Sequence, residues 1–209
     1  MADCVVGIDL SGVSGGTHGR TLLACLVIET PLRVFDRLIV PRGAKGDRIL
    51  LEWIEERKPL IVAIDAPLSL PHSVICEDSD CPRCEPGKAS YLARDVDGLV
   101  HGMPPVMLAA IAFRGIYLAR RLRGLGYEVI ETYPGGSYTA MGVTRDQLAK
   151  GGRVGAYELE PISSTIPDEV DAVCAALAAV AQAQDTGSAI GGRDGTIVVA
   201  GVELRQRHD

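Results

Sequence analysis

The sequence predicts an α/β fold in which a mixed β-sheet carries helices on both faces. Three observations support this expectation: β-rich runs crowd the first forty residues, helical and strand-like patterns alternate afterwards, and the last long helix is almost wholly apolar. The chain has 209 residues, of which 47% are hydrophobic and 23% charged, so it can bury a full core and is not disordered. We expect one domain over residues 1–209, because no linker or internal repeat divides the chain.

The N-terminal part is predicted to form a three-stranded meander. β-rich runs span Cys4–Leu10, Thr21–Glu29 and Arg33–Val40, with turn-forming residues between them. Apolar residues at helical spacing then predict a helix over Asp47–Arg57. The apolar run Leu60–Ile64 after this helix is typical of a buried central strand.

The second half alternates helices and strands after an irregular stretch. Residues 72–102 are polar and cysteine-rich without clear periodicity, so we expect an insertion there. Helices are predicted over Pro104–Arg123 and Pro167–Gln182, and strands over Tyr127–Tyr133 and Thr196–Ala200. This order matches the RNase H-like fold, whereas a Rossmann fold would open with a strand, a glycine fingerprint and a helix.

Acidic side chains follow several of the predicted strands. Asp9 and Asp65 end the first and fourth strands, Glu131 ends a later one, and Asp168 and Asp171 lie three residues apart on the last helix. Hard divalent cations bind converging carboxylate oxygens, and a pair of such ions supports phosphodiester hydrolysis. We therefore expect these five residues to be catalytic. The alternatives are turn-forming aspartates at the strand ends, and an Asp168 that only favours its helix N-terminus.

Basic and hydroxyl side chains near this site are candidates for substrate binding. We expect Ser11, Arg94 and Arg114 to contact phosphates. Arg114 could instead pair with Glu131. The formal charge of 21 − 27 = −6 argues against affinity for nucleic acid over the whole surface, but it leaves room for a local basic groove.

A second candidate metal site lies in the predicted insertion. Four potential ligands fall within thirteen residues: His72, Cys76, Cys81 and Cys84. This spacing suits tetrahedral Zn²⁺. A disulfide or free thiols are the main alternative, and an iron–sulfur cluster would need a distant fourth cysteine. Cys25 and Cys174 fall in predicted core elements, where we expect them buried and unpaired.

Several motifs resemble one family across nearly the whole chain. They are Gly7-Ile8-Asp9, Ile64-Asp65-Ala66-Pro67-Leu68, Arg94-x-x-Asp97, Arg114-Gly115, Ile130-Glu131-Thr132-Tyr133-Pro134 and Asp168-Glu169-Val170-Asp171. Together they look like domain-of-unknown-function family 429, described as predicted nucleases of RNase H fold. By similarity to Holliday-junction resolvases, the resemblance implies that Asp9, Asp65 and Asp171 hold metal ions and that Asp168 assists. The chain departs from the family between Pro71 and Arg94, where it carries the cysteines.

These observations predict a nuclease that uses Mg²⁺ or Mn²⁺ to hydrolyse DNA or RNA. Two alternatives stay open. A nucleotide-binding ATPase or kinase-like protein shares the pattern Gly7-x-Asp9-x-Ser11-Gly12, and a zinc-bearing adaptor would use only the cysteine cluster. The apolar runs are too short and glycine-broken to span a membrane, and the N-terminus lacks the basic start of a signal peptide, so we expect a cytoplasmic location.

Overall fold

The computed structural model describes residues 3–11, 20–41, 43–84, 94–100, 105–164, 166–192 and 194–201. The strands are β1 Cys4–Asp9, β2 Thr21–Val27, β3 Arg33–Val40, β4 Ile61–Asp65, β5 Glu128–Thr132, β6 Gly152–Val154, β7 Tyr157–Leu159, β8 Ser188–Gly192 and β9 Gly195–Val199. The helices are α1 Ala44–Arg57, α2 His72–Ile75, α3 Asp95–Val100, α4 Pro105–Gly124, α5 Pro134–Met141, α6 Arg145–Lys150 and α7 Pro167–Ala183.

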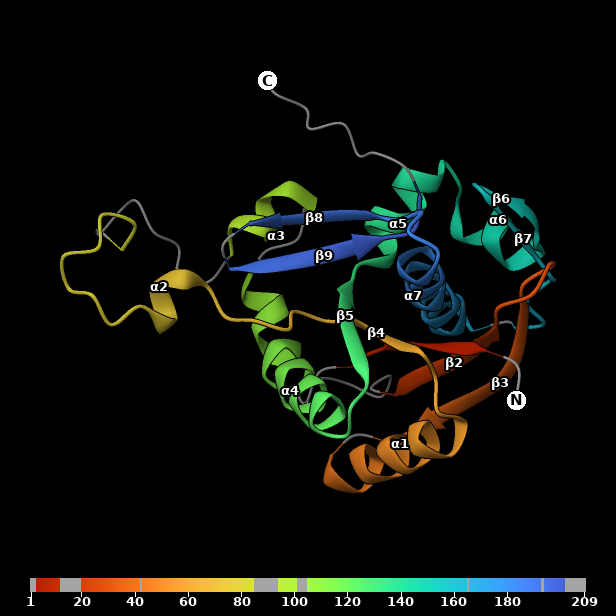
Figure 1. Ribbon diagram of the computed structural model, residues 1–209, viewed down its shortest axis with the longest axis horizontal. Coiled ribbons are helices and arrows are strands. Elements are labelled where there is room, and N and C mark those ends of the chain that lie inside the picture. Colours follow the sequence, from red (N-terminus) through yellow and green to blue (C-terminus); the bar gives the residue numbers. More distant parts are fainter. Residues whose placement is uncertain are drawn as a thin grey trace.

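The main sheet has seven strands in the order β3-β2-β1-β4-β5-β9-β8 (Figure 1). The first three strands form the predicted antiparallel meander, and β1, β4, β5 and β9 run parallel to one another. β8 pairs antiparallel with β9 at the far edge. Because parallel strands end at the same edge of a sheet, residues that close β1, β4 and β5 are brought together.

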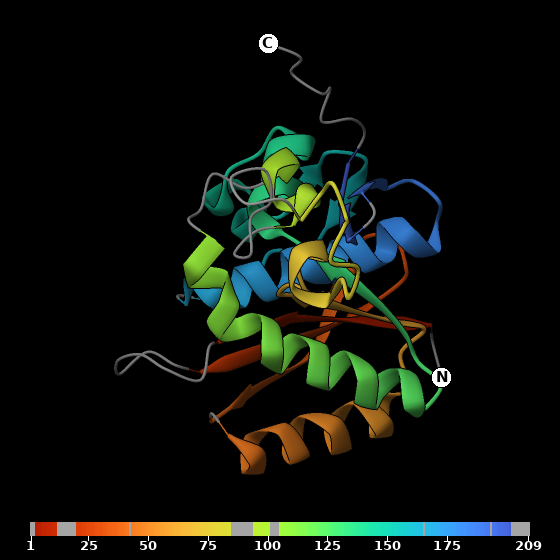
Figure 2. The ribbon, with the colours of Figure 1, turned by 90° about the vertical axis from the view of Figure 1, so that its left-hand side faces the viewer.

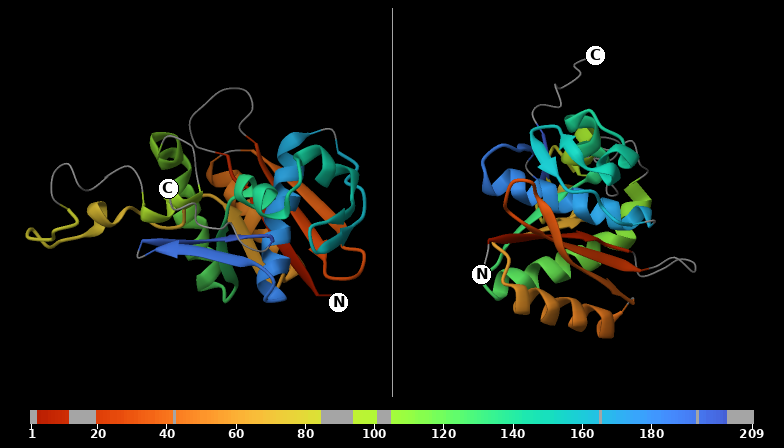
Figure 3. Two further views of the ribbon diagram at one scale, coloured as in Figure 1. Left: turned by 90° about the horizontal axis from the view of Figure 1, so that it is seen from above. Right: turned by 90° about the vertical axis from the view of Figure 1, so that its right-hand side faces the viewer.

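Helices cover both faces of this sheet, as the sequence predicts. α1 and α4 pack on one face and α7 crosses the other (Figure 2). Side chains alternate between the faces: Val5 and Ala63 belong to the core on the α7 side, whereas Ile8 and Ile64 belong to the core on the α1 and α4 side. The right-hand panel of Figure 3 shows the same layers from the side opposite to Figure 2.

The α7 helix lies unusually close to β1. A Cβ atom at Gly7 would stand 2.1 Å from the carbonyl oxygen of Ala172 and 2.2 Å from the backbone nitrogen of Ala176. Small side chains on the facing side of α7 permit the same approach, since most of the buried part of this helix is alanine. The glycine and the alanines together bring the N-terminal turns of α7 to the end of β1.

We expect Gly7→Ala to destabilise the fold by about 3 kcal/mol, because the new methyl group would overlap backbone atoms that cannot rotate away. Urea unfolding of both proteins measures the effect. Gly124→Ala is the matched control, since a Cβ there meets nothing within 4 Å. Equal stability of Gly7→Ala and the parent would contradict this account of the packing.

The segments between β5 and α7 and at the sheet edge differ from the sequence prediction. The short elements α5, α6, β6 and β7 were not predicted, and neither was β8. Each is eight residues or fewer, too short to show a clear period, and β8 exists through its pairing with β9. In the predicted insertion, α2 and α3 form, while residues 85–93 and 101–102 lie outside the described residues. No helix of the described part is long and apolar enough to cross a membrane.

Candidate metal centre

Three aspartates meet beyond the end of β1. Asp9 is the last residue of this strand, and Asp168 and Asp171 lie in the first turns of α7. One carboxylate oxygen from each residue lies within 4.8 Å of the other two, and all three side chains are partly exposed. The spacing of three residues places both helix aspartates on one face of α7. The close approach at Gly7 turns that face toward Asp9.

Asp65 lies beside this cluster on the neighbouring strand. It is the register partner of Asp9 in the parallel pair of β1 and β4, and paired strands run about 4.8 Å apart. Both side chains share the α7 side of the sheet, since Val5, four residues before Asp9, and Ala63, two residues before Asp65, point into that core. We call Asp9, Asp65, Asp168 and Asp171 the acidic cluster.

Thr132 lies on β5, the strand next to β4, and extends the line of polar residues formed by Asp9 and Asp65. Its predecessor Glu131 pairs with Ile64, so Thr132 comes level with Asp65, and it shares the face of Ile130, which packs in the core on the α7 side. Within the described residues its Oγ1 atom is buried without a hydrogen-bond partner. A buried hydroxyl normally finds a partner. Next to a set of carboxylates, this one is placed to bond a group bound at the cluster.

Burial and neighbouring negative charges raise the pKa of two carboxylates of the cluster, Asp9 and Asp65. Burial, and then the negative charges of Asp168 and Asp171, raise the pKa of Asp9 from its usual 3.8 to about 7. Burial, and then the charges of Asp9 and Asp171, raise the pKa of Asp65 well above its usual value. Both shifts have the sign expected for partly buried like charges without a compensating cation.

Asp171 has two polar partners of its own. The hydroxyl of Tyr138 donates to its Oδ1 at 2.6 Å, and Arg145 forms a two-pronged ion pair with the carboxylate at 3.0 and 2.5 Å. Burial raises the pKa of Tyr138, which keeps the phenol protonated as a donor. The Arg145 side chain remains 47% exposed. Arg145 is therefore a cation that contacts the cluster and also reaches solvent.

The donor set fits a hard divalent cation. Oxygens on one Mg²⁺ are at most about 4.2 Å apart, twice the metal–oxygen distance, so ligand oxygens within 4.8 Å need only a small adjustment. All the donors are carboxylate oxygens, which Mg²⁺ and Mn²⁺ prefer over softer ligands. Within the described part of the chain, the buried hydroxyl of Thr132 adds one more oxygen without a hydrogen-bond partner next to the carboxylates.

We expect Asp9→Asn to stabilise the metal-free protein, and to do so more at pH 8 than at pH 5. A carboxyl whose folded pKa is raised from 3.8 to about 7 binds protons more tightly in the folded state, so stability falls as the pH rises between these values. Removing the charge removes this loss of stability, which raises Tm by about 10 °C at pH 8. Thermal unfolding in EDTA at both pH values measures it, and an equal gain at pH 5 would contradict the linkage.

Glu131 lies at the same sheet edge but points to the opposite face. Its carboxylate accepts from Arg94 at 2.5 and 2.7 Å and from the backbone N–H of Leu68 at 2.8 Å. Both side chains are buried, with exposures of 5% for Glu131 and 1% for Arg94. Burial raises the pKa of Glu131, and the Arg94 guanidinium partly offsets this effect. The contacts of Glu131 are those of a buried ion pair, and its expected catalytic role stays a prediction.

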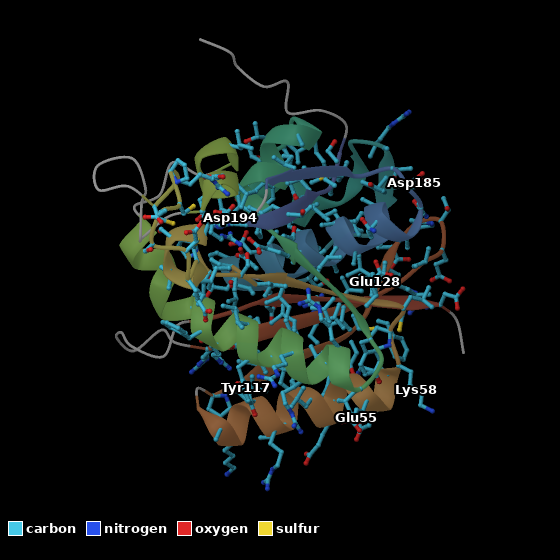
Figure 4. All side chains as sticks on the ribbon, turned by 60° about the vertical axis from the view of Figure 1, so that its left-hand side comes forward. Glu55, Lys58, Tyr117, Glu128, Asp185 and Asp194 are labelled. Atoms are coloured by element: carbon cyan, nitrogen blue, oxygen red, sulfur yellow. The ribbon has the colours of Figure 1, made fainter. Side chains whose placement is uncertain are left out.

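The same guanidinium joins several segments into one network. Arg94 also pairs with Asp97 at 2.6 Å and donates to the hydroxyl of Ser69 at 2.9 Å. Asp194, labelled in Figure 4 at the start of β9, accepts from the hydroxyl of Ser69 through its carbonyl and from the backbone N–H of Asp95 through its carboxylate. Arg94 thus ties α3 and β5 to the segment after β4.

Arg114 is likewise buried and fully engaged. It pairs with Asp47 of α1 at 2.6 and 3.0 Å and donates to the carbonyl oxygen of Ser11 at 2.8 Å and the hydroxyl of Thr21 at 2.7 Å. These contacts fasten α4 to α1 and to the first hairpin. The substrate-binding role expected for Ser11, Arg94 and Arg114 gains no support from these contacts and stays a prediction.

The four ligands in the predicted insertion also come together. One atom of each lies within 4.8 Å of the others: His72, Cys76, Cys81 and Cys84. A hydrogen bond with the imidazole of His72 lowers the pKa of Cys81 to about 6. All six cysteines are free, and Cys25 and Cys174 are buried, as predicted.

Sequence reasoning missed three side chains of the site: Thr132, Tyr138 and Arg145. Thr132 could have been found from strand alternation, because position 132 and not 131 shares the face of Ile130. Tyr138 and Arg145 lie on the unpredicted helices α5 and α6. Nothing in their local sequence points to Asp171, which lies more than twenty residues away along the chain.

Comparisons with known proteins bear on the fold. No family model matches the chain, and no curated protein matches it. The resemblance to family 429 therefore stays a prediction. Among solved structures, RuvC of T. thermophilus in complex with a Holliday junction substrate is 14% identical, with a TM-score of 0.50 over 93% of this chain and 99% of that chain. At this identity the likeness concerns architecture alone, and the chain has a mixed α/β fold similar to the RNase H-like fold of RuvC.

Proposed function

We propose that this protein is a nuclease that hydrolyses phosphodiester bonds of DNA or RNA with Mg²⁺ or Mn²⁺ held by the acidic cluster. The observation that carries the proposal is the convergence of three carboxylates within 4.8 Å, with Asp65 on the adjoining strand. Burial and mutual repulsion raise the pKa of both Asp9 and Asp65, which is the electrostatic situation that a divalent cation relieves. The RuvC-like fold also supports the proposal of a nuclease.

The four aspartates of the cluster come from the sheet and from α7, and so they approach the site from two sides. Asp9 and Asp65 project from paired central strands, so their separation is set by the sheet. Asp168 and Asp171 come from α7 and close the site from the other side. Two metal ions bound at the cluster would activate water and stabilise the negative charge that develops on the phosphate during hydrolysis. The hydroxyl of Thr132 is placed to orient a water molecule beside Asp65.

Arg145 is the residue we assign to the substrate phosphate. Its ion pair with Asp171 neutralises one carboxylate of the cluster, and its half-exposed side chain can turn toward solvent. A metal ion held by Asp171 would compete with the guanidinium for the same carboxylate, which would leave Arg145 able to bind phosphate. Guanidinium groups bind phosphate oxygens in the same two-pronged manner that Arg145 now uses for a carboxylate.

The test is cleavage of a panel of labelled nucleic acids. A four-way DNA junction comes first, because the structural neighbour is described with a Holliday junction, followed by single-stranded and duplex DNA and RNA. We expect products with Mg²⁺ or Mn²⁺ and little with Ca²⁺, whose looser coordination suits this geometry poorly. Failure to cleave any substrate, in protein shown by calorimetry to bind Mn²⁺, would contradict the proposal and favour nucleotide-binding assays next.

A further inference from the structure

A cysteine-rich arm projects from the body of the protein between β4 and α3. It comprises residues 72–84, begins with α2, and extends away from the sheet (Figures 1 and 3). None of its thirteen residues is buried, and none belongs to the hydrophobic core clusters. Val74 and Ile75 are at least half exposed. The arm therefore lacks the apolar burial that normally holds a segment of this length in one conformation.

What the arm does contain is a compact set of metal ligands. One atom from each of the four lies within 4.8 Å of the others, and Nε2 of His72 is 3.6 Å from Sγ of Cys81. Tetrahedral Zn²⁺ with a zinc–sulfur bond of about 2.3 Å and a zinc–nitrogen bond of about 2.0 Å separates these two ligand atoms by about 3.6 Å. The observed spacing equals the ligand edge of such a site.

Two local backbone turns in the arm each bring two of the four candidate ligands together. His72 is the first residue of α2, and Cys76 caps the C-terminal end of this helix, where its backbone N–H donates to the carbonyl of His72 at 2.9 Å. Cys81 and Cys84 share a tight turn closed by the N–H of Cys84 and the carbonyl of Cys81 at 2.9 Å. The N–H of Arg83 donates to the sulfur of Cys81. Backbone N–H groups that donate to sulfur stabilise a metal-bound thiolate.

The structure distinguishes between the alternatives for these cysteines. Three sulfurs and one imidazole do not match the four thiolates of an ordinary iron–sulfur cluster. The other cysteines cannot supply the fourth, since Cys4, Cys25 and Cys174 are buried in the sheet and in α7. The three arm cysteines form no disulfide, and a disulfide between any two of them would leave the third as an unpaired thiol.

We propose that the arm binds one Zn²⁺ through His72, Cys76, Cys81 and Cys84, and that this ion is what orders the arm. Four protein ligands close the tetrahedral shell, which is the arrangement of structural rather than catalytic zinc. The site goes beyond the proposed nuclease activity and is separate from the acidic cluster. Thiolate and imidazole ligands select zinc, whereas the carboxylates of the cluster select harder ions.

The first experiment measures metal content. Protein purified under reducing conditions from zinc-supplemented cells should contain about one zinc per chain by elemental analysis. Cys81→Ser and Cys84→Ser should each lose most of it. Cys25→Ala, which removes a thiol outside the arm, and Asp9→Asn, which disables the acidic cluster, should keep it. Zinc that is retained in Cys81→Ser but lost in Asp9→Asn would overturn the proposal, as would metal-free parent protein with its three arm thiols oxidised.

Cobalt substitution and hydrogen exchange test the ligand set and the ordering role. Co²⁺ exchanged into the parent should give thiolate-to-cobalt charge-transfer absorption and the intense visible bands of tetrahedral coordination, and both should vanish in Cys84→Ser. Removal of zinc by a chelator should speed amide exchange in residues 72–84 and leave exchange in α7 unchanged. An octahedral cobalt spectrum, bound iron in place of zinc, or unchanged exchange in the arm would each overturn the assignment.

Discussion

Asp9→Asn should lower the rate of nucleic-acid cleavage about a thousandfold or more while leaving the fold intact. Asparagine keeps the shape of the side chain but carries no charge, so the cluster loses an anionic ligand at its centre. Metal-ion stabilisation of the transition state is worth several kcal/mol, and each 1.36 kcal/mol is a factor of ten in rate. Single-turnover cleavage at saturating Mg²⁺, with circular dichroism to verify folding, measures the effect.

The matched control is Asp185→Asn. Asp185 is exposed just beyond the C-terminal end of α7, remote from the acidic cluster at its N-terminal end, and its φ of 54° suits asparagine. The same chemical change there should leave the rate unaltered (Figure 4 labels this residue). A parent-like rate for Asp9→Asn, or an equal loss in the control, would contradict the assignment of the cluster.

Arg94→Met should destabilise the fold by about 3–5 kcal/mol, or about 10 °C in Tm. The substitution leaves two carboxylates, Glu131 and Asp97, buried without their cation. Removing one partner of a buried ion pair typically costs this much, because the remaining charge keeps its desolvation penalty. Urea and thermal unfolding of parent and variant give the two values.

Two further variants identify the cause. Arg94→Met combined with Glu131→Gln should recover part of the lost stability, because one of the two orphaned charges is removed. Arg33→Met breaks an exposed pair with Glu29 and should change stability by less than about 0.5 kcal/mol. If Arg94→Met kept its stability and lost only cleavage, Arg94 would be a substrate residue, as the sequence predicts.

Much of the fold was accessible from sequence because its long elements carry clear patterns. The apolar runs of β1 and β4 and the helical stripe of α4 predict their structures to within a few residues. The alanine-rich α7 predicts a buried helix. The region between β5 and α7 was not predicted, since its short elements are stabilised by packing against α7 and by each other and show no period of their own.

The candidate site was predicted in part for a similar reason. An aspartate at the end of an apolar strand is visible in the sequence, and so is a pair of aspartates on one helix face. Glu131 shows the limit of this reasoning. It lies one residue before the end of a parallel strand, near the same edge as Asp65, but the alternation of side chains turns it to the other face, where it pairs with Arg94.

The sequence by itself determined the α/β architecture, the strand-end aspartates and the four candidate metal ligands of the arm, because periodicity and residue spacing are local properties. Only the tertiary structure decided which acids converge. Gly7 and the alanines of α7 let helix and sheet approach, so Asp168 and Asp171 reach Asp9 across more than 150 residues of chain. The tertiary structure also decided the partners of the arginines. A guanidinium group can bind a phosphate or a buried carboxylate, and the fold determines which of them lies beside it.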